Sequence, residues 1–228
     1  MAKNDASAEE RNKIIAELTS RFTWPIEEEF MRELFEVISD PVRRKHVVCW
    51  PRESSGQTPG FGRYLHEMAH ALLAEQVHPQ FSHPSFAPGT DPNLRNAYRP
   101  LFDAALDWYV QAVLMEIAPK AQGEDIDARF KQSASILRQG GALPSLEFVL
   151  DTGLALASFR HWRGLEVDAP GKLGQIVESF VRTDPRKPTL FGMHGLVRSL
   201  MAVFGSHHTG LVHDKDFERW RIDPVKKS

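Results

Sequence analysis

The sequence has a single cysteine, Cys49, among its 228 residues. One thiol cannot form a disulfide within the chain, so the fold must depend on its apolar core. A single thiol also excludes a zinc site built from several thiolates, which means that any zinc would be held by imidazole and carboxylate groups. Without a disulfide framework, a cytoplasmic location is the natural expectation.

Long apolar runs, net charge and internal repeats are also lacking. No stretch approaches the ~18 consecutive apolar residues of a transmembrane helix, and the first twenty residues lack the apolar region of a secretory signal. With 28 Lys and Arg against 30 Asp and Glu, the formal net charge is −2. Such a chain has no overall attraction to nucleic acids or anionic membranes, and we expect neither as a partner.

Helical patterns dominate what is present, and β-forming residues cluster only in the segment His46–Trp50. We predict a mainly α protein, a compact helical domain over residues 1–228 with at most a small β element beside the helix at about 61–77. Residues 1–40 are predicted to form two helices, the second beginning at Pro25, and residues 206–228 a tail or short packed extension. Further helices are predicted at about 61–77, 92–118, 124–138, 144–160, 170–182 and 188–204.

The most informative segment is YLHEMAHALL, which begins at Tyr64 and contains the pattern His-Glu-x-x-His. On a helix, His66 and His70 lie on one face with their Cβ atoms about 6 Å apart, so both imidazoles can bind one Zn²⁺. Glu67 lies at the edge of that face, where it can reach a metal-bound water without binding the metal. Two ligands, a general base and an open coordination position are what a metallohydrolase needs. The alternative is a pair of core histidines bonded to neighbours, with Glu67 in a salt bridge.

A catalytic zinc needs a third protein ligand, and the next predicted helix offers two. Asp103 and Asp107 are four residues apart in an otherwise apolar segment. Two carboxylates so placed repel each other and are costly to bury unless they face a cation, which a zinc ion held by the histidines would provide. The alternative is that they form salt bridges, for which the candidate partners are Arg95, Arg99 and Lys131.

Other histidines near the motif are weaker candidates. The metzincin pattern would require a histidine at position 76, where this chain has Gln76. His78 and His83 follow in a segment rich in proline and serine, and they stay open as ligands. A loop is a poor place to fix a metal ligand, so we favour the helical aspartates.

The His-Glu-x-x-His helix followed by a helix with an acidic residue resembles the zincin metallopeptidases of the gluzincin or aspzincin type. In that group an acidic ligand is often followed four residues later by an aspartate that supports a ligand histidine, which would make Asp103 the ligand. The chain is also similar to bacterial metallopeptidases encoded near von Willebrand A-type proteins. Their second motif, Asn-x-Ala-x-Asp, aligns with Ala105 and Asp107 and would make Asp107 the ligand. The resemblance spans about residues 60–112, and we favour Asp107, with Asp103 as its support.

These observations predict a zinc-dependent hydrolase of zincin-like fold, a metallopeptidase that acts on a protein or peptide with Glu67 as general base. The alternative is a catalytically inactive zincin-like scaffold, an interaction module in a larger bacterial complex that binds a protein partner or regulator. The two differ in the openness of the site. An open cleft at Glu67 supports an enzyme, whereas burial of Glu67 or a fourth protein ligand supports a scaffold.

Overall fold

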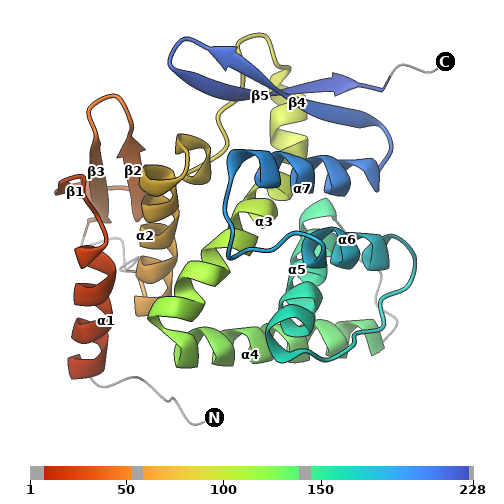
Figure 1. The fold of residues 1–228 in the computed structure, drawn as a ribbon, viewed down its shortest axis with the longest axis horizontal. Coiled ribbons are helices and arrows are strands. Elements are labelled where there is room, and N and C mark those ends of the chain that lie inside the picture. Colours follow the sequence, from red (N-terminus) through yellow and green to blue (C-terminus); the bar gives the residue numbers. More distant parts are fainter. Residues whose placement is uncertain (1–7, 53–58, 139–144, 226–228) are drawn as a thin grey trace.

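The computed structural model describes residues 8–52, 59–138 and 145–225, and most of these residues are helical. The mainly α class predicted from the sequence is therefore confirmed, with a small sheet beside the helices (Figure 1). The helices are α1 (Ala8–Ser20), α2 (Phe61–Gln76), η2 (Pro79–Phe81), α3 (Pro92–Ile117), α4 (Pro119–Arg138), α5 (Leu146–Arg163), α6 (Gly171–Val181) and α7 (Leu190–Ala202). The strands are β1 (Ile26–Arg32), β2 (Glu36–Asp40), β3 (Lys45–Pro51), β4 (His207–Asp214) and β5 (Phe217–Pro224). None of the described helices combines the length and the apolar content needed to cross a bilayer.

Helix α3 runs through the middle of the molecule and packs against α2, α4, α5 and α7 (Figure 1). Its second half is apolar on almost every side, and Trp108 and Tyr109 are fully buried. The indole N–H of Trp108 donates to the carbonyl of Thr183 at 2.8 Å, so this large ring is buried without losing its hydrogen bond. Pro100 lies within the helix and does not end it. Because other helices enclose the second half of α3, a polar side chain that is buried there is costly unless it has a partner.

The N-terminal sheet replaces the second helix that the sequence predicts from Pro25, and that prediction is wrong. Strand β3 lies in the centre, parallel to β1 and antiparallel to β2, and β2 packs against α2. Val37 pairs with Val48 on the buried side. The indole of Trp50 donates to Glu28 at 3.2 Å. Strand pairing with the apolar β3 thus overrides the helical preference of the local glutamates.

The C-terminal residues form a β4–β5 hairpin where the sequence predicts a tail or short extension. The hairpin packs on α7, and β5 extends its pairing to the loop after η2 (Figure 1). The backbone N–H of Ala87 donates to the carbonyl of Trp220 at 2.8 Å, and the N–H of Trp220 donates to Ser85 at 2.9 Å. The fully buried Gln80 adds side-chain bonds to the carbonyls of Ser85 and Glu218. The loop that follows α2 is therefore fixed by the last strand.

Candidate metal centre

Helix α2 presents the two motif histidines toward α3. The rest of the helix explains this orientation, because Leu65, Met68 and Leu72 are buried in the core. His66 and His70 are one helical turn apart, and their rings meet edge to face with centroids 4.8 Å apart. His70 is 9% exposed, whereas His66 is half-buried. The pair therefore lies between the core and the surface.

Asp107 of α3 completes a group of three ligand atoms. The Nε2 atoms of His66 and His70 are 3.2 Å apart. Each of them is also 3.2 Å from Oδ1 of Asp107. Three donors from two helices thus form a nearly equilateral triangle, and these three residues are the metal-ligand group found among the described residues.

The dimensions of this triangle fit zinc. Tetrahedral Zn²⁺ with ligands at 2.0–2.1 Å has neighbouring ligand atoms about 3.3–3.4 Å apart. The observed separations of 3.2 Å are close to this value for all three pairs. Two imidazoles and one carboxylate are also the type of donor set found in catalytic zinc sites with three protein ligands. Other divalent ions, Fe(II) among them, accept the same set.

The backbone of η2 fixes the tautomer of His70. Its Nδ1 is 2.9 Å from the carbonyl oxygen of Phe81, and a carbonyl can only accept a hydrogen bond. Nδ1 must therefore carry the proton, which leaves Nε2 of the neutral ring with a free lone pair directed at the other two ligand atoms. Such a second hydrogen bond is the usual way in which a protein orients a ligand histidine.

The electrostatics of the group favour a cation. Burial would raise the pKa of the Asp107 carboxyl, but its contacts with the two imidazoles outweigh burial and hold that pKa well below its usual range. Burial would lower the pKa of His70, but contact with the Asp107 carboxylate raises that pKa above its ordinary value. Asp107 is thus an anion at neutral pH, in contact with two imidazole nitrogens.

Glu67 lies beside this group at a cavity. The cavity has a volume of about 500 Å³ and is lined by residues of α2, α3 and α4, including His66, Glu67 and Asp107. The side chain of Glu67 is half-buried and has no hydrogen bond or ion pair with the described residues. The carboxylate is therefore available to a molecule that enters the cavity.

The remaining candidate ligands lie elsewhere. Asp103 pairs with Arg99 at 3.4 Å, one of the salt bridges considered as the alternative, and it is not among the three grouped ligands. Burial raises the pKa of Asp103, and the nearby charge of Asp107 adds to this shift. His78 caps η2 and contacts Glu218 at 3.1 Å. His83 is exposed and contacts Ser82 at 3.2 Å. Within the described ranges, no fourth side chain joins the group.

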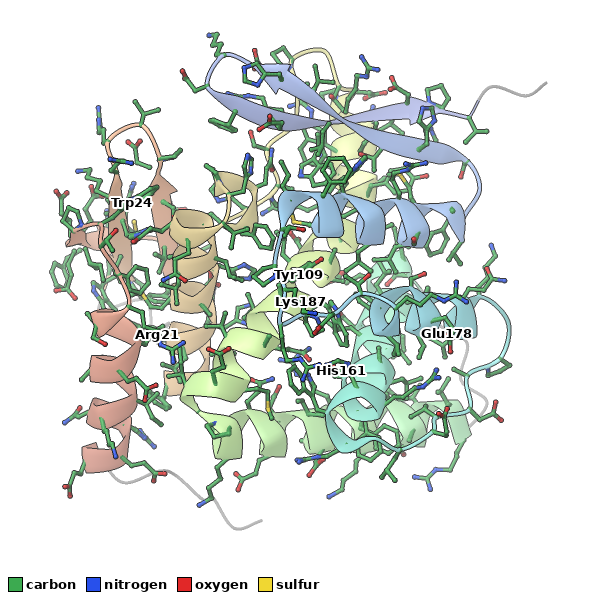
Figure 2. All side chains as sticks on the ribbon, in the orientation of Figure 1. Arg21, Trp24, Tyr109, His161, Glu178 and Lys187 are labelled. Atoms are coloured by element: carbon green, nitrogen blue, oxygen red, sulfur yellow. The ribbon has the colours of Figure 1, made fainter. Side chains whose placement is uncertain are left out.

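A second imidazole–carboxylate pair joins the other end of α2 to the sheet. Nε2 of His46 is 3.0 Å from Oε2 of Glu75, and both side chains are almost fully buried. The Glu75 carboxylate also accepts bonds from the backbone and hydroxyl of Thr23 and from the backbone of Trp24. Figure 2 labels Trp24, whose ring stacks on that of His46. The sequence does not indicate this pair, because its members are 29 residues apart and match no spacing pattern.

Gln111 is a further residue that sequence analysis missed. It follows Asp107 by one helical turn, lines the cavity and is 8% exposed. Its Oε1 is buried and has no hydrogen-bond partner among the described residues. The signal was present in the sequence, because a polar side chain four residues after Asp107 must share its face of the helix.

Comparison with protein-family models, with curated proteins and with solved structures finds no match to this chain. The function of this chain must therefore be inferred from the geometry of its site.

Proposed function

We propose that this protein is a zinc-dependent hydrolase, and specifically a metallopeptidase. The observation that carries the proposal is the convergence of three ligand atoms 3.2 Å apart beside a cavity at which Glu67 has no partner among the described residues. A histidine pair buried for structural reasons would not need a free carboxylate and a cavity next to it. The zincin-like character of the fold is part of this proposal, as is the assignment of a protein or peptide as substrate.

Each residue of the site would have a separate role in hydrolysis. His66, His70 and Asp107 would hold the metal, and the Phe81 carbonyl keeps the Nε2 lone pair of His70 in place. Zinc in such a site lowers the pKa of a bound water and polarises a carbonyl group. Glu67 accepts the proton of the attacking water and passes it to the leaving amine as the peptide bond breaks. The cavity beside Glu67 receives the substrate.

Zinc is preferred over Fe(II) because of Glu67. A site of two histidines and one carboxylate also serves ferrous oxygenases. A free carboxylate next to the ligands has a direct use in hydrolysis, where a water must lose a proton, and this favours the hydrolytic metal. The cytoplasmic location expected from the sequence stays a prediction.

Metal analysis of purified protein tests the proposal. We expect one zinc per chain in the wild type and none in the double variant His66→Ala with His70→Ala, measured by mass spectrometry after dialysis. The wild type should also cleave members of a mixed peptide library, with the products detected by mass spectrometry. Iron in place of zinc, or equal zinc in the double variant, would contradict the proposal. Zinc without cleavage of any peptide would favour the inactive scaffold.

A further inference from the structure

A second pocket lies near the N-terminal end of α3. It is open to the surface, and its volume of about 500 Å³ lies in the range of ligand-binding pockets. Its lining comes from the first two turns of α3, the start of α5 and the turn through which α7 leads into β4 (Figure 1). Tyr98 in this lining and Asp107 lie about 14 Å apart along α3 and on opposite sides of the helix. The second pocket is therefore separate from the candidate metal centre.

Most of the lining of the second pocket is apolar. Leu94 and Ala97 of α3, Leu146 of α5 and Phe204 contribute this part. Ala97 is exposed and the other three side chains are half-buried, so all four still contact water. A hydrocarbon group that covered them would remove apolar surface from water, which is favourable. This part of the second pocket therefore suits a hydrocarbon group.

The three remaining lining residues bring their polar atoms together. The Tyr98 hydroxyl is 2.8 Å from Nδ1 of His207 and 3.5 Å from the Ser206 hydroxyl. A tyrosine and a neutral histidine each carry one hydrogen that can be donated, and their mutual bond uses one of the two. Among the described residues the other has at most the long contact with Ser206. The pair can therefore donate one hydrogen bond to a bound molecule.

An unpaired positive charge lies next to this lining. The ammonium group of Lys172 is 5.7 Å from the centre of the Phe204 ring. Lys172 is exposed and forms no ion pair with the described residues. A carboxylate in the second pocket would be attracted by this charge, and it would accept a hydrogen bond from the pair of Tyr98 and His207. A cationic head group would instead be repelled by Lys172.

We propose that the second pocket binds a small apolar carboxylate, a molecule with one carboxylate and a hydrocarbon body of medium length. The hydrocarbon body lies on Leu94, Leu146 and Phe204, and the carboxylate accepts a hydrogen bond from the pair of Tyr98 and His207. A hydrogen bond that only tied α3 to β4 would not need an apolar pocket beside it. This site goes beyond the proposed function and does not depend on zinc.

Calorimetric titration of octanoate into the wild-type protein tests the inference. Butanoate and 1-octanol are the matched probes, because the first shortens the hydrocarbon body and the second removes the charge. We expect octanoate to bind at least about 10-fold more tightly than butanoate, since four more methylene groups leave water. We expect 1-octanol to bind about 5-fold more weakly than octanoate, because its hydrogen bond is not assisted by charge. Equal affinities for octanoate and 1-octanol would overturn the inference of a carboxylate.

Substitutions of alanine by tryptophan locate the site. Ala97→Trp places an indole in the second pocket and should weaken octanoate binding at least about 10-fold, because the ring occupies the space of the ligand. Ala128→Trp is the matched control, since Ala128 is an exposed alanine of α4 that does not line the second pocket. It should bind octanoate as the wild type does. Equal binding by the two variants would overturn the inference.

Two milder substitutions test the recognition of the carboxylate. Tyr98→Phe keeps the ring, removes the hydroxyl and should weaken octanoate binding about 5-fold. Lys172→Gln should weaken octanoate binding about 3-fold and leave 1-octanol unchanged, because only the anion is attracted by the ammonium group. Lys120→Gln is its control, since Lys120 is an exposed lysine of α4 outside the second pocket.

The metal ligands separate this inference from the proposed function. The double variant His66→Ala with His70→Ala should bind octanoate as the wild type does. Loss of binding in that variant would place the carboxylate at the metal centre and overturn the inference, as would a wild type that binds no octanoate. A wild-type dimer that Ala97→Trp dissociates would show that a second copy covers the pocket, with the same result. Absence of zinc from the wild type would contradict the proposed function alone.

Discussion

Helix α2 contributes to two groups of imidazole and carboxylate side chains. One group, the closed assembly of His46 and Glu75, is enclosed and hydrogen-bonded. The other, the open assembly of His66, His70 and Asp107, lies beside a cavity. At the C-terminal end of α2, Glu75 and His46 are 3.0 Å apart and enclosed by the sheet. The Glu75 carboxylate accepts bonds from Thr23 and Trp24 as well as from His46, and Nδ1 of His46 is 2.9 Å from the Ser39 hydroxyl. Every polar side-chain atom of this pair has a partner among the described residues.

Near the middle of α2, His66 and His70 meet Asp107 of α3, and their three ligand atoms lie 3.2 Å from one another. Next to them Glu67 has no partner within the described residues, and a cavity opens. The contrast shows that an imidazole–carboxylate contact alone does not indicate function. The distinguishing features are donor atoms that converge and a polar group left without a partner.

The largest expected effect is a loss of peptide cleavage when the open assembly loses the neighbouring carboxylate of Glu67. Glu67→Gln removes the proposed general base and should reduce peptide cleavage by about 10²–10⁴-fold. Zinc content and melting temperature should stay at wild-type values, because Glu67 binds neither the ligands nor the core. Mass-spectrometric detection of peptide products, together with metal analysis, checks this result. Cleavage that persists at the wild-type rate would refute Glu67 as the base.

The two aspartates of α3 give the next largest effect. Asp107→Ala removes one of the three ligand atoms and should weaken zinc binding by at least about 100-fold. Asp103→Ala is the matched control, because it breaks only an exposed pair with Arg99 and should change zinc affinity little. Competition with a chromogenic chelator measures both affinities. A larger loss in the Asp103 variant would reverse the assignment.

A substitution in the closed assembly should change the free energy of unfolding and leave metal binding unchanged. Glu75→Gln replaces a buried carboxylate that accepts several hydrogen bonds, and should lower the free energy of unfolding by about 2–3 kcal/mol. Glu116→Gln breaks an exposed pair with Arg21 and should cost less than about 1 kcal/mol. Urea unfolding compares the two, and zinc content should be unchanged in both. If Glu75→Gln lost zinc, the two assemblies would not be independent of each other.

The smallest effect is the pH dependence of the closed assembly. Burial lowers the pKa of the folded His46 below its ordinary value of 6.5. At a pH below that value, the unfolded chain therefore binds a proton more readily than the folded chain does. The free energy of unfolding should therefore fall as the pH drops below about 6.5. Glu75 adds a further loss below about 4.5, because the hydrogen bonds it accepts outweigh its burial and lower its pKa in the folded chain.

Comparison of the wild type with His46→Gln isolates this contribution, since the other titrating groups are common to both. Between pH 6.5 and pH 5.5 the wild type should lose more stability than the variant, by up to about 1 kcal/mol. Equal slopes in urea unfolding across this range would show that His46 does not titrate as its burial requires.

The sequence predicted those parts of the fold whose signals are local. The apolar stretches and flanking prolines of α2 and α3 placed both helices correctly, and the four-residue spacing of His66 and His70 predicted their shared face. The local spacing places Asp103 and Asp107 on one side of α3, so the preference for Asp107 came from the family resemblance. In the structure Asp107 is the one grouped with His66 and His70.

The failures came from long-range pairing. Three glutamates after Pro25 favour the first turn of a helix, but β1 is stabilised by β3, about twenty residues away. In the β4–β5 hairpin, apolar and polar residues alternate too weakly to predict strands. The loop with which β5 pairs is more than 130 residues earlier in the chain. Such contacts have no local signature in a single sequence.

The hydrogen bond from His70 to Phe81 has a consequence for the order of events during synthesis. The loop that presents the Phe81 carbonyl is bonded to β5 through Gln80, Ala87 and Trp220. A nascent chain on the ribosome therefore has both histidines and Asp107 more than 100 residues before the strand that fixes this loop. The site reaches its final geometry only after Trp220 has emerged, so the molecule gains its complete site late, after nearly all of the described chain has been made.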